Sequence, residues 1–289
     1  KKPFFKSSRS FYLINFFHML YKKKLKISII GIIIMKTPYI DLVQSVLNHG
    51  TLEDGRNGKT LVCIGKTMRF SLENKMIPLL TTKRVAWKTC LRELLWFVKG
   101  FTNNKMLKEQ NVKIWNANAS REFLDSRNLY HLKEDDLGPI YGHQWRYYNA
   151  AYTNCNANYT GKGVDQLGNI IKSLKEGEYS RRMIMCAWNP CQINEMALPP
   201  CHVLVQFHVT EGKKLSCSLY QRSGDIGLGV PFNIASYSFL THLLAHHCNL
   251  EAKEFVHHIG NAHIYDDHVE SLKTQIKRKP YEYPKLKIN

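Results

Sequence analysis

One stretch of the chain, residues 198–233, brings a thiol close to polar and charged groups; it reads LPPCHVLVQFHVTEGKKLSCSLYQRSGDIGLGVPFN. Cys201 follows two prolines, which restrict the backbone at the start of an alternating polar and apolar run. A hairpin between this run and the next would return Arg222 and Ser223 to the cysteine. A guanidinium and a hydroxyl suit a phosphate, and a nearby cation lowers the pKa of a thiol from about 8.5. The pattern therefore predicts a cysteine nucleophile beside a phosphate site.

Cys201 also has a simpler interpretation, because free cysteine is among the most buried residue types. Several other cysteines lie in apolar contexts and are interpreted as core: Cys63, Cys186, Cys217 and Cys248. Cys201 differs from them in the Pro-Pro pair before it, in His202 after it and in its expected closeness to Arg222. From the residues alone, both a core residue and a nucleophile remain open.

Three motifs in this order resemble thymidylate synthase: LPPCH at 198–202, YQRSGDIGLGVPFNIASY at 220–237 and GNAHIY at 260–265. The similarity runs from about Tyr39 to Asn289. It implies an α+β fold, a mixed β-sheet with surrounding helices, that forms a homodimer through a sheet face. The implied reaction is reductive methylation of dUMP to dTMP with 5,10-methylenetetrahydrofolate as one-carbon and hydride donor, yielding dihydrofolate.

Glu93 lies beside a helical apolar stripe between Val85 and Gly100, where an ordinary surface carboxylate is not expected. By itself it is interpreted as a salt-bridge partner at the helix edge or as a functional acid. The segment LRELLWFVKG resembles the glutamate helix of thymidylate synthases, and Glu93 matches its catalytic carboxylate. Desolvation by Trp and Leu would raise its pKa, as a general acid near neutral pH requires.

The resemblance also assigns roles to residues outside the central stretch. The aromatic segments around Trp115 and Tyr141 are, by themselves, equally typical of a core and of a stacking surface. The implied catalytic residues are Cys201, Glu93, Tyr141, Asn233 and Asp225. The implied dUMP-binding residues are Arg56, Arg181, Arg182, Gln221, Arg222, Ser223, Asn233, His263 and Tyr265, with Arg181 and Arg182 reaching across the dimer. The implied folate-binding residues are Trp115, Asn118, Asp225 and Gly229.

Asn233 is expected to read the base. A side-chain amide offers an acceptor next to a donor, which matches the N3–H and O4 of uracil in one of its two orientations. The alternative is that Asn233 only caps the helix that is expected to begin there. Deoxycytidylate hydroxymethylases, which share the fold and the nucleophile, carry an aspartate at the matching position. Asparagine therefore favours the synthase over this first rival.

The charge balance of the 289 residues is strongly basic, with a formal net charge of +18. Residues 1–40 contain nine Lys and Arg and no acidic residue, so this segment carries half of the excess. A basic protein favours anionic ligands, either phosphorylated small molecules or nucleic acid. The chain contains no RRM, KH, zinc-finger or basic-zipper pattern. RNA binding, or a structural role without turnover, is kept as the second rival.

The eight cysteines form no CxxC pair, which argues against a disulfide framework and against zinc, so no metal is expected. A reducing compartment follows, and the expected location is the cytoplasm, or the nucleus or mitochondrion if residues 1–35 are a targeting segment. Residues 1–35 are interpreted as a basic, apolar appendage outside the fold, and 36–289 as the catalytic domain. The apolar runs within residues 1–35 are each shorter than the roughly 20 residues of a membrane span.

Periodicity places the elements that would position these side chains. It predicts helices over 38–48, 85–100, 164–177 and 233–249. It predicts strands over 61–72, 183–188, 202–209, 215–220 and 254–260, with a basic loop at 56–60 before the first of them. Members of the family continue beyond PKLKIN through a segment that closes the site. The expectation for these 289 residues is therefore dUMP binding without efficient turnover.

Overall fold

The computed structural model describes residues 26–28, 37–55 and 58–288. Most of the segment 1–35, and Arg56 with its loop neighbour Asn57, lie outside the described residues. Within that segment, Lys26–Ser28 form strand β1, which pairs antiparallel with β8 (Lys285–Lys287). No helix in the described ranges combines the length and the apolar character needed to cross a membrane.

The other elements mix long strands with helices of very different lengths; short 3-10 helices are labelled η. In chain order they are α2 (Pro38–His49), β2 (Thr51–Gly55), β3 (Gly58–Ser71), η1 (Glu73–Lys75), α3 (Trp87–Val98), α4 (Lys105–Lys108), α5 (Arg121–Ser126), α6 (Tyr141–Tyr147), α7 (Gln166–Glu176), β4 (Ile184–Cys186), η2 (Ile193–Glu195), β5 (His202–Thr210), β6 (Lys214–Asp225), α8 (Gly229–His247), β7 (Glu251–Tyr265), η3 (Asp266–His268) and α9 (Val269–Gln275).

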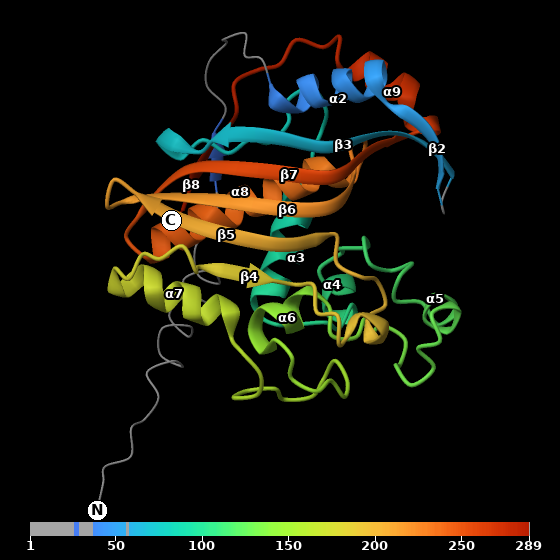
Figure 1. Ribbon diagram of the computed structural model, residues 1–289, viewed down its shortest axis with the longest axis vertical. Helices are drawn as coiled ribbons and strands as arrows, with labels where there is room; N and C mark the ends of the chain where they lie inside the picture. Colours follow the sequence, from blue (N-terminus) through green and yellow to red (C-terminus); the bar gives the residue numbers. More distant parts are fainter. Residues whose placement is uncertain (1–25, 29–36, 56–57, 289) are drawn as a thin grey trace, which may run out of the picture.

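Six strands form one mixed sheet in the order β2-β3-β7-β6-β5-β4 (Figure 1). Strands β6 and β7 run parallel, and the other neighbouring pairs are antiparallel. The predicted α+β fold with a mixed sheet is confirmed. Because of these directions, the start of β5 and the ends of β6 and β7 meet at one end of the sheet. That end carries Cys201, Arg222 and His263.

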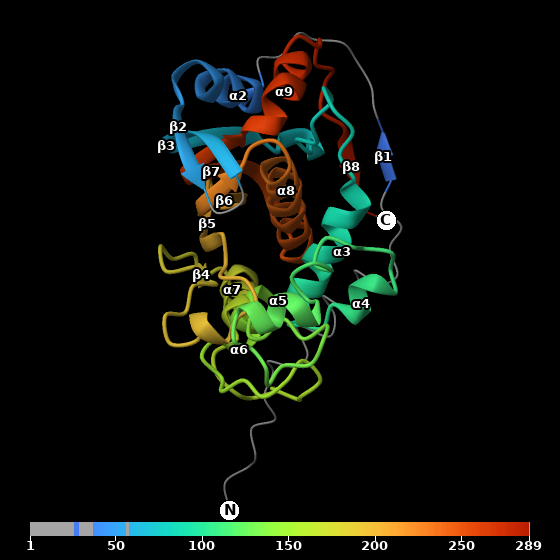
Figure 2. The same cartoon turned by 90° about the vertical axis from the view of Figure 1, so that its right-hand side faces the viewer.

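Helix α8 is the centre of the core. It packs on β6 and β7, and α3 packs beside it. Figures 1 and 2 show both helices on the same face of the sheet, whereas no described helix covers the opposite face of β5, β6 and β7. Tyr237 of α8 stacks on Phe255 of β7 with ring centroids 6.0 Å apart. A helix that is apolar on nearly all sides must be enclosed in this way.

Helix α8 begins at Gly229, about one turn before the predicted start at Asn233. Pro231 lies in its first turn, where a missing N–H removes no hydrogen bond, so the proline does not delay the helix. The N-cap residue is Leu228. The interpretation of Asn233 as a helix cap is therefore wrong, because this side chain lies inside the helix.

Two further boundaries differ from the prediction. The expected loop at 56–60 is shorter, because β3 begins at Gly58 and pairs with the unpredicted strand β2, so that Gly55 lies opposite Gly58. All five residues of β2 are exposed, which leaves no apolar alternation to detect in the sequence. Strand β7 continues past residue 260 to Tyr265, since its pairing with β6 runs to Asp225 opposite His263.

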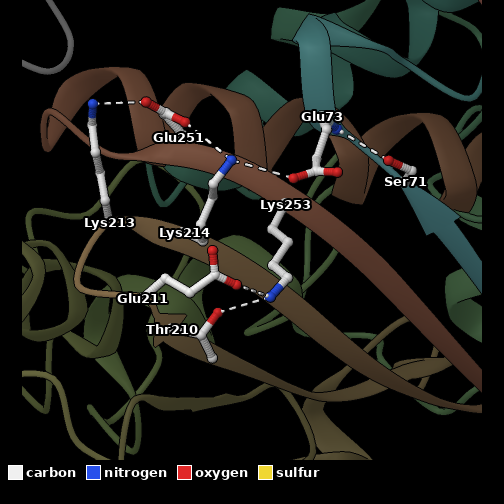
Figure 3. Close-up of polar contacts among 8 residues, drawn as sticks. All are labelled: Ser71, Glu73, Thr210, Glu211, Lys213, Lys214, Glu251 and Lys253. Atoms are coloured by element: carbon white, nitrogen blue, oxygen red, sulfur yellow. Dashed lines mark hydrogen bonds and ion pairs between the residues drawn. The ribbon is translucent and has the colours of Figure 1, made fainter.

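Ion pairs hold the other end of the sheet together (Figure 3). Nζ of Lys214 lies 3.2 Å from carboxylate oxygens of both Glu73 and Glu251, which ties β6 to η1 and β7. Lys253 pairs with Glu211 at 2.7 Å. These groups are open to solvent, which screens their charges, so each pair contributes little to stability. A cavity of about 560 Å³ lies beside Lys214, and none of the predicted site residues lines it.

Candidate active site

Cys201 stands immediately before β5, half-buried, behind the two prolines. Its carbonyl oxygen accepts a hydrogen bond from the backbone nitrogen of Arg222 at 2.9 Å. The guanidinium of Arg222 donates to the carbonyl oxygens of Pro200 (Nε, 2.9 Å) and Pro199 (Nη2, 3.0 Å). The predicted hairpin thus brings Arg222 to the cysteine, and the contacts fix the backbone on both sides of the thiol.

Tyr141, the first residue of α6, lies against Cys201 from the opposite side. Its hydroxyl oxygen accepts hydrogen bonds from the backbone nitrogens of Cys201 at 2.7 Å and His202 at 3.4 Å. Burial raises the pKa of the phenol, and the negative charge that Cys201 would carry adds to this. The ring is only 5% exposed and packs against Phe97, with centroids 4.8 Å apart. Tyr141 therefore joins the aromatic core to the candidate nucleophile.

Glu93 of α3 is half-buried next to this aromatic cluster. Its Oε1 accepts a hydrogen bond from Nε1 of Trp115 at 2.7 Å. Burial raises the pKa of the carboxyl group to about 7, and the Trp115 hydrogen bond partly offsets that effect. The alternative of a salt bridge is wrong for the described residues, since no cation pairs with this carboxylate. Glu93 can therefore exchange a proton near neutral pH.

The turn after β6 is organised by Asp225. Its Oδ1 accepts hydrogen bonds from the backbone nitrogens of Gly227 at 2.8 Å and Leu228 at 3.2 Å. Gly229 follows, and a Cβ built there would lie 3.8 Å from Cβ of Asp225 and 3.9 Å from Oδ1 of Asn233. The turn therefore places Asp225, Gly229 and Asn233 together, as predicted from the central stretch.

The end of β7 contributes His263 and Tyr265, whose rings meet edge to face with centroids 5.3 Å apart. Nδ1 of His263 lies 3.0 Å from Oδ1 of Asn261. Burial lowers the pKa of His263, which keeps the ring neutral near pH 7. Ser223 pairs with Asn261 across the parallel strands. The predicted ribose and phosphate residues of β6 and β7 are therefore neighbours.

Two predicted arginines lie apart from this group, and Arg56 cannot be placed. Arg181 and Arg182 are exposed in the turn before β4, and their guanidinium groups form no hydrogen bond or ion pair within the described part of the chain. Asn118 is half-buried three residues after Trp115, which itself is 7% exposed and packs on Phe97 at 6.4 Å. Burial therefore favours the core interpretation for most of the Trp115 ring.

Sequence reasoning missed two polar side chains that belong to the group. His202 hydrogen-bonds the side chain of Asn233, and burial lowers the pKa of the imidazole to about 4. Lys83 donates through Nζ to the carbonyl oxygen of Gly227 at 2.7 Å and so holds the turn after Asp225. The position of His202 next to Cys201 was a usable signal. Lys83 offered none, because it reaches Gly227 only through the tertiary fold.

Comparison with known proteins decides the family. The sequence profile described as "Thymidylate synthase" matches residues 37–289. The chain belongs to the thymidylate synthase family. It is 53% identical over 251 residues to "Thymidylate synthase" of Homo sapiens, an alignment that covers 86% of this chain and 80% of the human protein.

Other members of the family that match are longer. "Bifunctional dihydrofolate reductase-thymidylate synthase" of Plasmodium berghei is 53% identical over 252 residues, which is 87% of this chain and 43% of that protein. "Probable thymidylate synthase" of Schizosaccharomyces pombe is 54% identical over 256 residues, 86% of this chain and 41% of that protein. The chain thus spans less than half the length of these two thymidylate synthase relatives.

Proposed function

We propose that the chain converts dUMP to dTMP, with 5,10-methylenetetrahydrofolate as co-substrate and dihydrofolate as second product. The observation that carries the proposal is the convergence of Cys201, Arg222 and Asn233 at one end of the sheet. These residues would supply a nucleophile, a cation for the phosphate and an amide for the base. Membership of the thymidylate synthase family supports the same reaction.

The nucleophilic step follows from the chemistry of uracil. Carbon 6 is electrophilic because O4 withdraws electrons through the C5–C6 double bond. The thiolate of Cys201 would add to carbon 6, forming a carbon–sulfur bond while the double-bond electrons move towards carbon 5 and O4. A later elimination breaks the carbon–sulfur bond and restores the thiolate. The fixed backbone on both sides of Cys201 would hold the sulfur in position for both steps.

Proton transfers would fall to Glu93 and Tyr141. With its pKa near 7, the carboxyl group of Glu93 would give a proton towards O4 through water and take it back. Tyr141, whose hydroxyl already contacts the backbone of Cys201, would assist removal of the proton at carbon 5.

The phosphate and ribose would be held by residues from several elements. Nε and Nη2 of Arg222 contact the two prolines, and Nη1 has no hydrogen bond to any described residue, so Nη1 would be available to the phosphate. Ser223, Arg56, and Arg181 and Arg182 of a second copy would complete the phosphate site. Gln221, His263 and Tyr265 would border the sugar and base.

The residues also fit a folate. Only Oδ1 of Asp225 is hydrogen-bonded among the described residues, so Oδ2 remains an acceptor for pterin N–H groups. Gly229 leaves room beside it, and Trp115 and Asn118 would border the bound molecule. When bound, the folate supplies the one-carbon unit and the hydride. Asp225 and Gly229 would orient it, and the aromatic rings would exclude water.

A homodimer formed through the sheet face would explain how the exposed Arg181 and Arg182 reach a phosphate site. The face of β5, β6 and β7 opposite α8 has no helical cover in the described part of the chain. Apolar side chains are exposed on two strands of this sheet: Ile184 at 40% and Tyr220 at 46%. A second copy packed there would bury them and carry its Arg181 and Arg182 towards the phosphate.

The location is proposed from the cysteines. All eight are free thiols. This is compatible with a reducing compartment, and we propose the cytoplasm.

The test is detection of a covalent adduct by intact mass after mixing with 5-fluoro-dUMP and methylenetetrahydrofolate. We expect an adduct with wild type and with Cys191→Ser, which removes an exposed thiol outside the group. Cys201→Ser should give no adduct and no turnover, because a hydroxyl has no thiolate population, yet it should still bind dUMP. An adduct on Cys201→Ser, or dUMP binding by wild type without any adduct, would overturn the proposal.

A further inference from the structure

Gln221 has a hydrogen-bonding arrangement that needs a second partner. It lies on β6 opposite His202 of β5, beside Arg222, and its side chain is 3% exposed. Its Nε2 donates to the carbonyl oxygen of Ser223 at 2.9 Å. If the amide turned over, Oε1 would face that carbonyl, and two acceptors would meet in a buried place. A donor to Oε1 would therefore stabilise the amide in this orientation.

His257 of β7 provides that partner. Its Nε2 lies 2.8 Å from Oε1 of Gln221, and the ring is fully buried. Since Oε1 can only accept, Nε2 must carry the proton, so the geometry assigns the Nε2–H tautomer. Nδ1 is then a bare acceptor, and it has no hydrogen-bond partner among the described residues.

The surroundings of the ring keep it neutral. Burial, together with the neighbouring His202 and His258, lowers the pKa of His257 to about 3. A second ring proton on Nδ1 would have no acceptor in the described structure. Phe255, whose ring centroid is 5.4 Å away, packs against the imidazole. His257 is therefore neutral near pH 7 and donates to Gln221 through Nε2.

We propose that His257 is a positioning residue that holds the amide of Gln221 in one orientation towards the nucleotide. Gln221 donates one N–H to the carbonyl oxygen of Ser223, and its Oε1 accepts from His257. The second N–H would then be available to a ligand beside Cys201. This rests on the proposed function, in which Gln221 contacts dUMP. His257 itself is separated from the reacting atoms by Gln221 and acts only through it.

The first experiment does not depend on turnover. The ¹⁵N chemical shifts of His257 in the ligand-free protein distinguish a protonated nitrogen from a bare one. We expect protonated Nε2 and bare Nδ1, and slow solvent exchange of the Gln221 side-chain amide. Protonation on Nδ1 would overturn the proposal, whatever the enzyme turns over.

The second experiment compares three variants. His257→Phe keeps a ring but removes the donor, and we expect kcat/KM for dUMP to fall roughly tenfold to a hundredfold, with most of it restored in His257→Gln. His242→Phe is the matched control, because Nε2 of this buried histidine lies 2.7 Å from the carbonyl oxygen of Met76, far along α8 from Asn233. It should lower the thermal unfolding temperature similarly and leave kcat/KM unchanged. Equal kinetic losses in both Phe variants, or no rescue by Gln, would show that His257 serves packing alone. A wild type that does not bind dUMP would instead contradict the proposed function.

Discussion

The hydroxyl oxygen of Tyr141 accepts a hydrogen bond from the backbone nitrogen of Cys201 across 2.7 Å. The two residues are sixty positions apart in the chain and come from α6 and the entrance of β5. The contact therefore couples the packing of the aromatic core to the position of the thiol, so that a change in the core packing would shift the thiol.

We predict that Tyr141→Phe lowers both stability and turnover. The variant leaves the N–H of Cys201 without its acceptor, which should lower the free energy of unfolding by about 1–3 kcal/mol in urea denaturation. Turnover should fall further, because the proposed proton transfer loses its hydroxyl. Tyr152→Phe is the control, since its hydroxyl donates to Asp136 at 2.6 Å outside the candidate site. It should lose stability and keep kcat/KM; equal kinetic losses would remove Tyr141 from the mechanism.

Glu93 should make both rate and stability depend on pH. Its pKa is raised from 4.5 to about 7, so the folded protein binds a proton that the unfolded chain has already released between these values. Stability from this group is full below about pH 4.5 and is lost as pH rises to 7, by an amount of the order of 2–3 kcal/mol. Glu93→Gln should remove that loss and the decline of kcat above pH 7. If Glu93→Gln showed the same pH dependence of kcat and of the free energy of unfolding as the wild type, Glu93 would not be the titrating group.

Trp115 should tune the same titration. Its hydrogen bond stabilises the ionised carboxylate and lowers the pKa of Glu93, so Trp115→Phe should move the titration to higher pH. Trp87→Phe is the control, because Trp87 lies on α3 like Glu93 but packs on Phe239, with ring centroids 6.4 Å apart. The measurement is the pH dependence of kcat for both variants. A downward shift in Trp115→Phe would mean that the indole does not stabilise the charged form.

Subunit mixing should test the proposed dimer. A heterodimer of Arg182→Ala and Cys201→Ala subunits has one site free of both lesions, so random mixing should restore about a quarter of wild-type activity. Mixing Arg222→Ala with Cys201→Ala should restore none, because Arg222 acts beside the cysteine of its own chain. Mixed dimers that form but stay inactive in the first pair would show that Arg182 does not cross the interface.

The sequence predicted the parts of the site that are close in the chain or carried by long motifs. The alternation around Cys201 and the hairpin to Arg222 are local, and the hydrogen bond between their backbones confirms them. The start of α8 was predicted about one turn too late, because Gly229 begins the helix and Pro231 is tolerated in its first turn.

Other contacts had no signal in the sequence because they depend on strand pairing. His257 and Gln221 are thirty-six positions apart and meet only through the parallel register of β6 and β7. Lys83 reaches Gly227 across 144 positions. The pattern of two adjacent histidines at 257 and 258 shows that they point to opposite faces of a strand, but it does not show which face is buried.

The choice of base rests on the orientation of Asn233. This side chain lies inside α8, and His202 hydrogen-bonds it. Burial lowers the pKa of His202 to about 4, so its ring is neutral near pH 7 and has one donor and one acceptor nitrogen. A neutral neighbour of this kind can hold the amide in the orientation that offers an acceptor to N3–H and a donor to O4 of uracil.

We therefore predict that Asn233→Asp erodes or reverses the preference for dUMP over dCMP. Cytosine presents an acceptor at N3 and a donor at its amino group, so the wild-type amide is mismatched at both atoms. A mismatched buried pair costs about 1–3 kcal/mol, which makes the expected preference roughly tenfold to a hundredfold. Competitive binding measures it, with Asn261→Asp as a control that changes a neighbour of His263 and should leave the ratio unchanged. Because the contacts of Arg222 to the two prolines are untouched, phosphate binding should persist in Asn233→Asp. An unchanged ratio in this variant would mean that Asn233 does not read the base.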